Sequence, residues 1–338
     1  MKNKKKKKIK IKKPPVLFNE TQKVIKKIGK TLDGDILAYW ISNNGSLTQG
    51  DITPFYNIIK NNAKSKTLYL FVKSNGGSGK SALRIIHLLR NYYEKIVALV
   101  PLDCASAATM LVLGANKIQM GPLAYLSAID TSITHELSPI DKKYNNKVSV
   151  SQNELDRVLK LWDKQKTESE PSPYSALYQY IHPLVFGSVD RASSLSIKLT
   201  KEILSYHLKD EKKADKISNH LNAEYPSHGY PITIKEAKKI GLNVEGLPGN
   251  INELLLELNY LYSKMAQRSH TDYNETKYHD NEILKVIELM GHQYFYQKEK
   301  DWFYRKEERR YIPMNDDSSW RRAKLVNGKV EVSKFYSR

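Results

Sequence analysis

Ser106 is the residue whose position supports the most specific chemistry. It follows a buried-strand pattern, KIVALVP at 95–101, and opens an apolar helical run, SAATMLVLGA. Unpaired N–H groups and the helix dipole favour negative charge at a helix N-terminus, so a serine there can serve as a nucleophile. The flanking Ala105 and Ala107 would leave its hydroxyl uncrowded. A purely structural role, in which Ser106 only caps the helix, stays open.

A second feature is the turn SNGGSGKS at 74–81, which follows the strand pattern TLYLFVK. Glycines after a strand let the backbone direct its N–H groups outward. We therefore expect Gly76 and Gly77, together with the amide of Ala107, to form an oxyanion hole, which stabilises the negative charge that develops during acyl transfer.

The same turn also approaches the P-loop pattern, with Gly79, Lys80 and Ser81 in place. Ser74 stands where the first glycine of that pattern belongs. The nearest Walker-B-like segment ends at Asp103 after only one intervening helix. A nucleotide-binding ATPase that uses Lys80 is thus an alternative, ranked below the hydrolase.

Strand and helix patterns alternate over the first half of the chain. We expect strands at 35–42, 67–73, 95–101, 117–120 and 124–127, and helices at 51–62 and 82–93 and from Ser106. This alternation predicts an α/β fold with a mostly parallel sheet and flanking helices. Both candidate turns follow strand ends, where such sheets place their sites.

From about residue 150 the pattern becomes helical. Helices are expected at 151–165, 188–208, 211–221, 234–241 and 249–266. The remainder is charged and Tyr-rich; we interpret 298–312 as a solvated helix with one apolar side. Asn327-Gly328 predicts a closing hairpin turn. The expected units are a disordered polybasic tail at 1–15, a hydrolase domain at 16–248 and a helical, charged extension at 249–338.

Charge and cysteine content limit the class of protein. The net charge of the chain is +19. Nine of these positive charges are Lys side chains of residues 1–13, and without them the net charge would be +10. Such a tail is either a solubilising arm or a contact for an anionic partner, nucleic acid or an acidic membrane surface. The single cysteine, Cys104, excludes an intrachain disulfide. Without a membrane-spanning apolar run or a signal peptide, we expect a cytoplasmic protein.

Several motifs between about residues 30 and 245 resemble the serine dehydrogenase proteinase family. This family is a distant branch of the Clp protease/crotonase superfamily, which also includes signal peptide peptidase A. The matching segments are SNGG at 74–77, VP at 100–101, ASAAT at 105–109, ANKIQMGP at 115–122, SAID at 127–130, IHPLVFGSVDRASSL at 181–195 and SHGYPITIKEAKKIGLNV at 227–244.

The resemblance implies a Clp/crotonase-like fold and a serine peptidase that self-assembles and needs no cofactor or metal. Carried over by position, the family's catalytic residues become Ser106, Asp130 and His228. In such a triad the imidazole moves the serine proton and the carboxylate orients the imidazole. Asp130 could instead cap a turn, and His228 could be a buried structural histidine.

Other general bases stay open as well. His182, which precedes a proline, is one, although a structural turn role is expected for it. The signal peptide peptidase branch uses a lysine, and the candidate lysines are Lys142, Lys143, Lys147 and Lys198.

The sequence also departs from the family pattern. Asn75 replaces the proline of the glycine turn. SAIDTS at 127–132 keeps Asp130 of its motif but loses the motif's Gly, Pro and Gln. Gly229 replaces a residue that is acidic in many relatives. A second hypothesis is therefore a catalytically decayed interaction protein that binds nucleic acid or protein through its tail and through 298–312.

Overall fold

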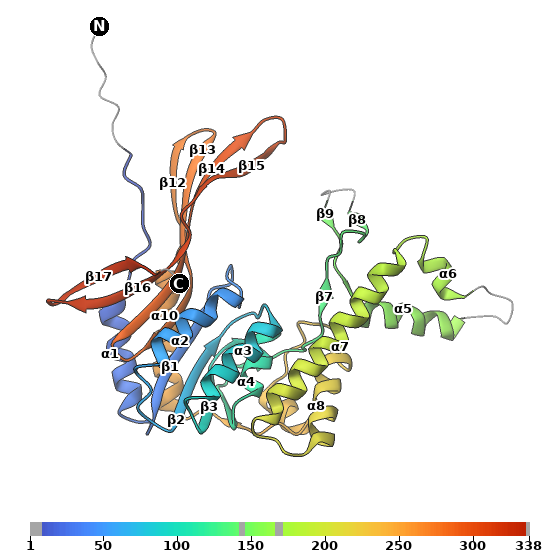
Figure 1. Ribbon diagram of the computed structural model, residues 1–338, viewed down its shortest axis with the longest axis horizontal. Helices are drawn as coiled ribbons and strands as arrows, with labels where there is room; N and C mark the ends of the chain where they lie inside the picture. Colours follow the sequence, from blue (N-terminus) through green and yellow to red (C-terminus); the bar gives the residue numbers. More distant parts are fainter. Residues whose placement is uncertain (1–8, 142–145, 166–171, 336–338) are drawn as a thin grey trace, which may run out of the picture.

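A mixed β-sheet flanked by helices forms the centre of the molecule (Figure 1). The computed structural model describes residues 9–141, 146–165 and 172–335. Parallel strands run in the order β11, β5, β3, β2, β1. Their bounds are β11 (Val244–Gly246), β5 (Lys117–Met120), β3 (Lys95–Val100), β2 (Thr67–Lys73) and β1 (Asp35–Ile41). The predicted α/β class, with a parallel sheet and flanking helices, is confirmed.

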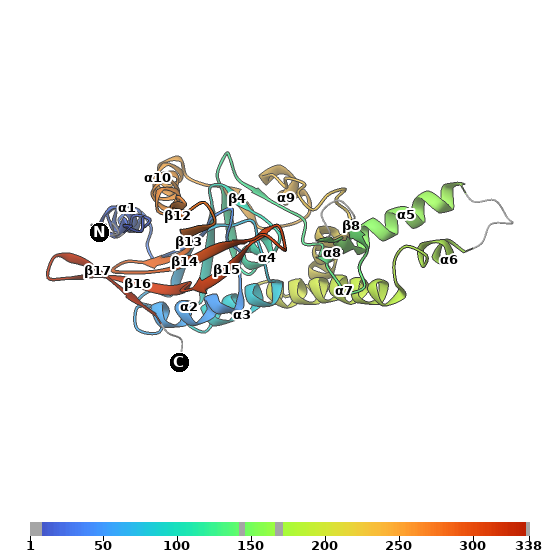
Figure 2. The ribbon, with the colours of Figure 1, turned by 90° about the horizontal axis from the view of Figure 1, so that it is seen from above.

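Helices cover both faces of this sheet because its strands are apolar on both sides. On β1, Leu37 and Tyr39 belong to one buried cluster, while Ile36 and Trp40 belong to the other. Figure 2 shows the two helical layers on opposite sides of the sheet. One layer contains α2 (Ile52–Ile59), α3 (Gly79–Arg90) and α4 (Ala107–Leu113), and the other contains α1 (Phe18–Gly29) and α10 (Gly249–Met265). All of these except α1 were expected from the sequence.

The chain after Met265 forms strands, so the expectation of a helical extension is wrong beyond α10. These strands are β12 (Ser269–Asn274), β13 (Lys277–Leu289), β14 (His292–Arg305), β15 (Arg310–Asp316), β16 (Ser319–Val326) and β17 (Lys329–Lys334). β13 pairs antiparallel with β1, from Leu37 opposite Leu289 to Ile41 opposite Lys285. The predicted turn at Asn327-Gly328 is confirmed, since both residues have positive φ and join β16 to β17.

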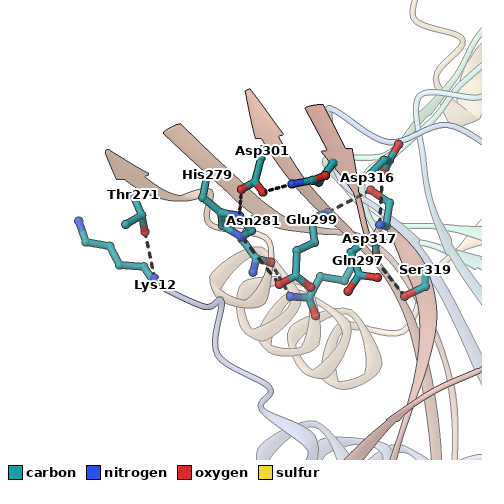
Figure 3. A network of polar contacts seen from close by, with 12 residues as sticks. Lys12, Thr271, His279, Asn281, Gln297, Glu299, Asp301, Asp316, Asp317 and Ser319 are labelled. Atoms are coloured by element: carbon teal, nitrogen blue, oxygen red, sulfur yellow. Dashed lines mark hydrogen bonds and ion pairs between the residues drawn. The ribbon is translucent and has the colours of Figure 1, made fainter. Parts of the chain in front are cut away.

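The segment 298–312 is likewise not a helix but the end of β14, a turn and the start of β15. Its first charges are paired across strands, as for Lys300 with Asp316 at 2.8 Å, whereas residues 305–310 at the turn are exposed. Figure 3 shows the polar ladder along these strands, in which the Nδ1 of buried His279 lies 2.9 Å from Asp301 Oδ1. A pattern of alternating charges can therefore belong to a strand whose partners are distant in sequence.

A helical arm extends from the opposite end of the sheet (Figure 2). Its helices are α5 (Gln152–Gln165), α6 (Pro173–Leu177), α7 (Pro183–Ser205) and α8 (Glu211–Ala223), with α9 (Ile234–Lys239) leading back to β11. The short strands β7 (Ser132–Ile133) and β10 (Val150–Ser151) pair at the base of the arm, and β8 (Ile140–Asp141) pairs with β9 (Asn146–Lys147). α7 packs against α8 within the arm, and against α3 and α4, which fixes the arm to the main body.

The predicted polybasic tail at 1–15 falls largely on residues 1–8, which lie outside the described residues. Of the described part, residues 9–17 form neither helix nor strand, and the Lys12 N–H donates to Thr271 Oγ1 at 3.0 Å (Figure 3). Among the described helices, none is both long and apolar enough to cross a bilayer.

Candidate active site

Ser106 lies in a sharp strand-to-helix turn. β4 (Asp103–Cys104) ends two residues before it and α4 begins directly after it. Its backbone has φ 54° and ψ −122°, a conformation that L-residues with side chains rarely adopt. The Ser106 N–H donates to Ser127 Oγ at 2.8 Å, and the residue is half-buried. Within the described chain, the Ser106 hydroxyl has no hydrogen-bond partner.

The glycine turn contacts Ser106 directly. A Cβ at Gly76 would lie 2.7 Å from Ser106 Cβ and 3.1 Å from the Ala107 nitrogen. Two main-chain hydrogen bonds join the segments, from Ser74 N–H to Asp103 O at 3.0 Å and from Ala105 N–H to Ser74 O at 2.9 Å. A glycine is needed at 76 because any side chain there would collide with the candidate nucleophile.

The three predicted oxyanion donors are not equivalent. The Gly76 N–H already donates to Ser74 Oγ at 3.0 Å, so it is occupied. The N–H groups of Gly77 and Ala107 have no acceptor among the described residues. Of the three expected donors, only the Gly77 and Ala107 N–H groups are thus unoccupied among the described residues, and Gly76 allows the close approach between the two turns.

Asp130 and His228, 98 residues apart in sequence, form a hydrogen-bonded pair. The His228 Nδ1–H donates to Asp130 Oδ1 at 2.7 Å. The Asp130 side chain is 13% exposed and that of His228 is 50% exposed. This hydrogen bond to Asp130 raises the pKa of His228, because the carboxylate stabilises the imidazolium. With Nδ1 engaged, Nε2 remains free to accept a proton, as a general base requires.

The pair is positioned by a backbone contact between two loops. Leu126 in β6 (Tyr125–Leu126) bridges to Ile232, four residues after His228. Asp130 and His228 line a pocket of about 310 Å³, together with Ser132, Glu154, Arg157, Tyr225 and others.

The structure does not join Ser106 to this pair. Ser106 Oγ makes no hydrogen bond to His228, and Ser106 is not among the residues that line the pocket. The connection runs through Ser127, which accepts the Ser106 N–H and precedes Asp130 by three residues. Ser106 and the Asp130–His228 pair thus lie on neighbouring loops with no hydrogen bond between them.

The other candidate bases do not contact Ser106. His182 caps α7, since its Nδ1 accepts the Leu184 N–H at 3.1 Å, in line with the structural role expected for it. Lys147 and Lys198 are exposed, and neither hydrogen-bonds Ser106. Lys142 and Lys143 lie outside the described residues.

The P-loop alternative does not fit the turn. Ser81, which would have to bind Mg²⁺, is fully buried within α3. A Cβ at Gly79 would lie 2.9 Å from Met110 Sδ, so the turn packs against α4 rather than surrounding a phosphate. In the described part of the chain, no cluster of three or more His, Cys, Asp or Glu side chains is suited to a metal ion.

An ion pair that the sequence analysis missed lies just before the two turns. Lys73 Nζ is 3.2 Å from Asp103 Oδ2 and 2.9 Å from Asn43 Oδ1. Lys73 is the last residue of β2, and Asp103 precedes Ser106 by three positions. In the sequence, Lys73 and Asp103 are each a charged residue at or just after the end of an apolar strand pattern. No sequence feature indicates that these two residues pair with each other.

Fold and site together define a mixed α/β protein with a free serine hydroxyl at a strand-to-helix turn. No protein-family profile matches the chain. It is 24% identical over 208 residues to the uncharacterized protein MJ0137 of Methanocaldococcus jannaschii. That match covers 62% of this chain and 63% of the relative, so the chain spans less than two thirds of the relative's length.

Two solved structures are similar at low level. Both are mutants of 1510-N, a membrane-bound stomatin-specific protease. One has a TM-score of 0.38 and 16% identity, over 67% of this chain and 86% of that chain. The other, in complex with a substrate peptide, has a TM-score of 0.26 and 16% identity, over 69% of this chain and 100% of that chain.

Proposed function

We propose that this protein is a serine hydrolase that cleaves peptide bonds with Ser106 as nucleophile. The observation that carries the proposal is the contact between the Ser106 turn and the Gly76-Gly77 turn. A Cβ at Gly76 would lie 2.7 Å from Ser106 Cβ. The next N–H group along each turn, that of Gly77 and that of Ala107, has no acceptor among the described residues. Fixed donors of this kind stabilise a developing oxyanion without reorganisation during the reaction.

In the proposed reaction, Ser106 Oγ attacks the carbonyl carbon while His228 Nε2 takes the hydroxyl proton. The tetrahedral oxyanion is held by the Gly77 and Ala107 N–H groups. His228 then returns the proton to the leaving amine, and water hydrolyses the acyl-enzyme by the same steps. Asp130 orients the ring and stabilises the imidazolium.

This mechanism requires His228 to approach Ser106. Catalytic hydrogen bonds are often long or absent without substrate and form in the substrate complex. The half-exposed His228 side chain has room to move, whereas the Ser106 backbone is held by its bond to Ser127. The motif resemblance of residues 30–245 favours peptide substrates, and self-assembly in the cytoplasm is part of the same proposal.

The test is covalent labelling by a fluorophosphonate probe. We expect labelling of the full chain and its loss in Ser106→Ala. Ser132→Ala is the matched control, because Ser132 is an exposed serine in the pocket beside His228. Unchanged labelling of a folded Ser106→Ala variant would exclude Ser106 as the nucleophile.

A second candidate function follows from the lack of a hydrogen bond between Ser106 and the Asp130–His228 pair. If the site has lost activity, the chain is an interaction protein that binds an anionic partner through its Lys-rich residues 2–13. Salt-dependent retention on DNA that disappears when residues 1–13 are deleted would favour this function. Retention that is insensitive to the deletion would exclude the tail as the contact.

A further inference from the structure

A groove of about 650 Å³ lies between α1 and the C-terminal strands. The sheet order separates it from the candidate active site, since β1, β13 and β14 lie between β2 and β16. Its apolar lining is Phe18 from α1, Met290 from the β13–β14 turn and Leu325 from β16. Met290 and Leu325 are 44% and 55% exposed and so open to a ligand, whereas Phe18 is 4% exposed.

The charged side chains that line the groove are all basic. They are Lys23 and Lys26 on α1, and Arg322 and Lys324 on β16. No aspartate or glutamate is among the lining residues, and within the described chain none of these four cations forms an ion pair. The adjacent Arg321, by contrast, is paired with Glu299.

Arg322 is the most constrained of the four cations. It is half-buried, one of its terminal nitrogens (Nη2) donates to His292 Nδ1 at 3.2 Å, and its guanidinium lies 5.6 Å from the Tyr294 ring centre. Its Nε is buried without a partner. Burial, then the charges of Arg322 and Lys64, lower the pKa of His292, which keeps the imidazole neutral. The guanidinium charge is therefore partly desolvated and has no counter-ion, a state that a bound anion would stabilise.

We propose that this groove binds a single-chain anionic amphiphile, with its head group on Arg322 and its chain along Phe18, Met290 and Leu325. Charge complementarity favours an anionic occupant, since the bordering cations attract an anion, repel a basic chain and add no charge attraction for a neutral one. The volume falls within the range of roughly 300–1,000 Å³ that is typical of small-molecule sites. The site does not depend on the hydrolase proposal.

The test uses the full chain and a fluorescent fatty acid, displaced by dodecanoate below its micelle concentration. We expect saturable binding of dodecanoate and dodecyl phosphate, and much weaker binding of dodecanol. Arg322→Gln should weaken dodecanoate by about tenfold or more, because it removes a charge-assisted contact. Lys329→Gln, an exposed lysine of β17 outside the groove, is the matched control and should bind like the native chain.

Arg322 also packs on Tyr294, so thermal unfolding must show that Arg322→Gln is folded. The surface double variant Lys23→Gln/Lys26→Gln gives an independent test and should weaken dodecanoate as well. Equal affinity for dodecanoate and dodecanol, or equal losses in Lys329→Gln and Arg322→Gln, would overturn the proposal. Binding to anionic vesicles with no binding of monomeric dodecanoate would also overturn it and would assign the groove to a membrane surface.

Discussion

At Ser106 the backbone has φ 54° and ψ −122°, which costs a residue with a side chain about 1–3 kcal/mol. The surrounding contacts maintain this conformation. The Ser106 N–H is held by Ser127, and Gly76 packs against Ser106 Cβ. A simple helix cap does not need a positive φ, since caps normally lie in the extended region. The strain therefore favours the nucleophile hypothesis over the capping hypothesis for Ser106.

Replacing Gly76 tests this packing. Gly76→Ala would place a methyl group 2.7 Å from Ser106 Cβ at a φ of 105°. We expect a loss of about 1–3 kcal/mol in the free energy of unfolding and slower fluorophosphonate labelling. Gly29→Ala is the control, because nothing lies within 4 Å of the added Cβ at the end of α1. A fully stable, normally labelled Gly76→Ala variant would contradict the described contact.

The Asp130–His228 pair predicts a pH dependence of labelling. Because the hydrogen bond to Asp130 raises the pKa of His228 above 6.5, the neutral base form prevails only above that raised value. The labelling rate should therefore rise with pH, with a midpoint above 6.5. Asp130→Asn should move the midpoint down, since it removes the group that stabilises the imidazolium. A midpoint that does not change in Asp130→Asn would exclude His228 as the base.

Among the elements, the ends of β2 and β3 are joined by a side-chain ion pair as well as by the hydrogen bonds of the sheet. The side chains of Lys73 and Asp103 are 9% and 19% exposed. Their ion pair lies immediately before the glycine turn and the Ser106 turn. Lys73 Nζ also lies near Ile41 O at 3.3 Å and 5.5 Å from the Trp40 ring centre. Three successive chain segments thus meet at one ammonium group.

Lys73→Met should leave the Asp103 carboxylate unpaired in a largely buried position. The expected loss is about 3 kcal/mol in the free energy of unfolding, because an uncompensated buried charge is costly. Lys73→Met/Asp103→Asn should recover part of this loss, and urea unfolding of the two single variants and the double variant measures the coupling. Strictly additive losses would show that the two side chains do not interact.

Across the whole molecule, the N-terminal helix and the C-terminal strands are joined through Glu288 of β13. Its carboxylate is fully buried and accepts hydrogen bonds from Thr21 at 2.7 Å, Gln22 at 2.6 Å, Tyr262 at 2.8 Å and Gln293 at 2.7 Å. These residues belong to α1, α10 and β14. Burial raises the pKa of Glu288 from 4.5 to about 7, although the four donors oppose that shift.

A raised pKa makes this junction sensitive to pH. Between pH 4.5 and 7 the folded chain holds a proton on Glu288 that the unfolded chain has lost, so stability falls as pH rises through this window. The expected contribution is about 3 kcal/mol. Comparing urea unfolding at pH 5 and pH 7.5 measures it, and Glu288→Gln should reduce the difference. An equal difference in the variant would exclude Glu288 as the source.

Elements with local signals could be predicted from the amino-acid sequence. Apolar runs such as 67–73 and 95–101 predicted the parallel strands, and Asn327-Gly328 predicted a hairpin because both residues tolerate positive φ. Other features arise only when distant segments meet in the folded chain. It paired β13 with β1, occupied the Gly76 N–H with Ser74 and joined Lys73 to Asp103. Each of these depends on which segments meet in space, and strand pairing over more than 200 residues leaves no periodic trace in the sequence.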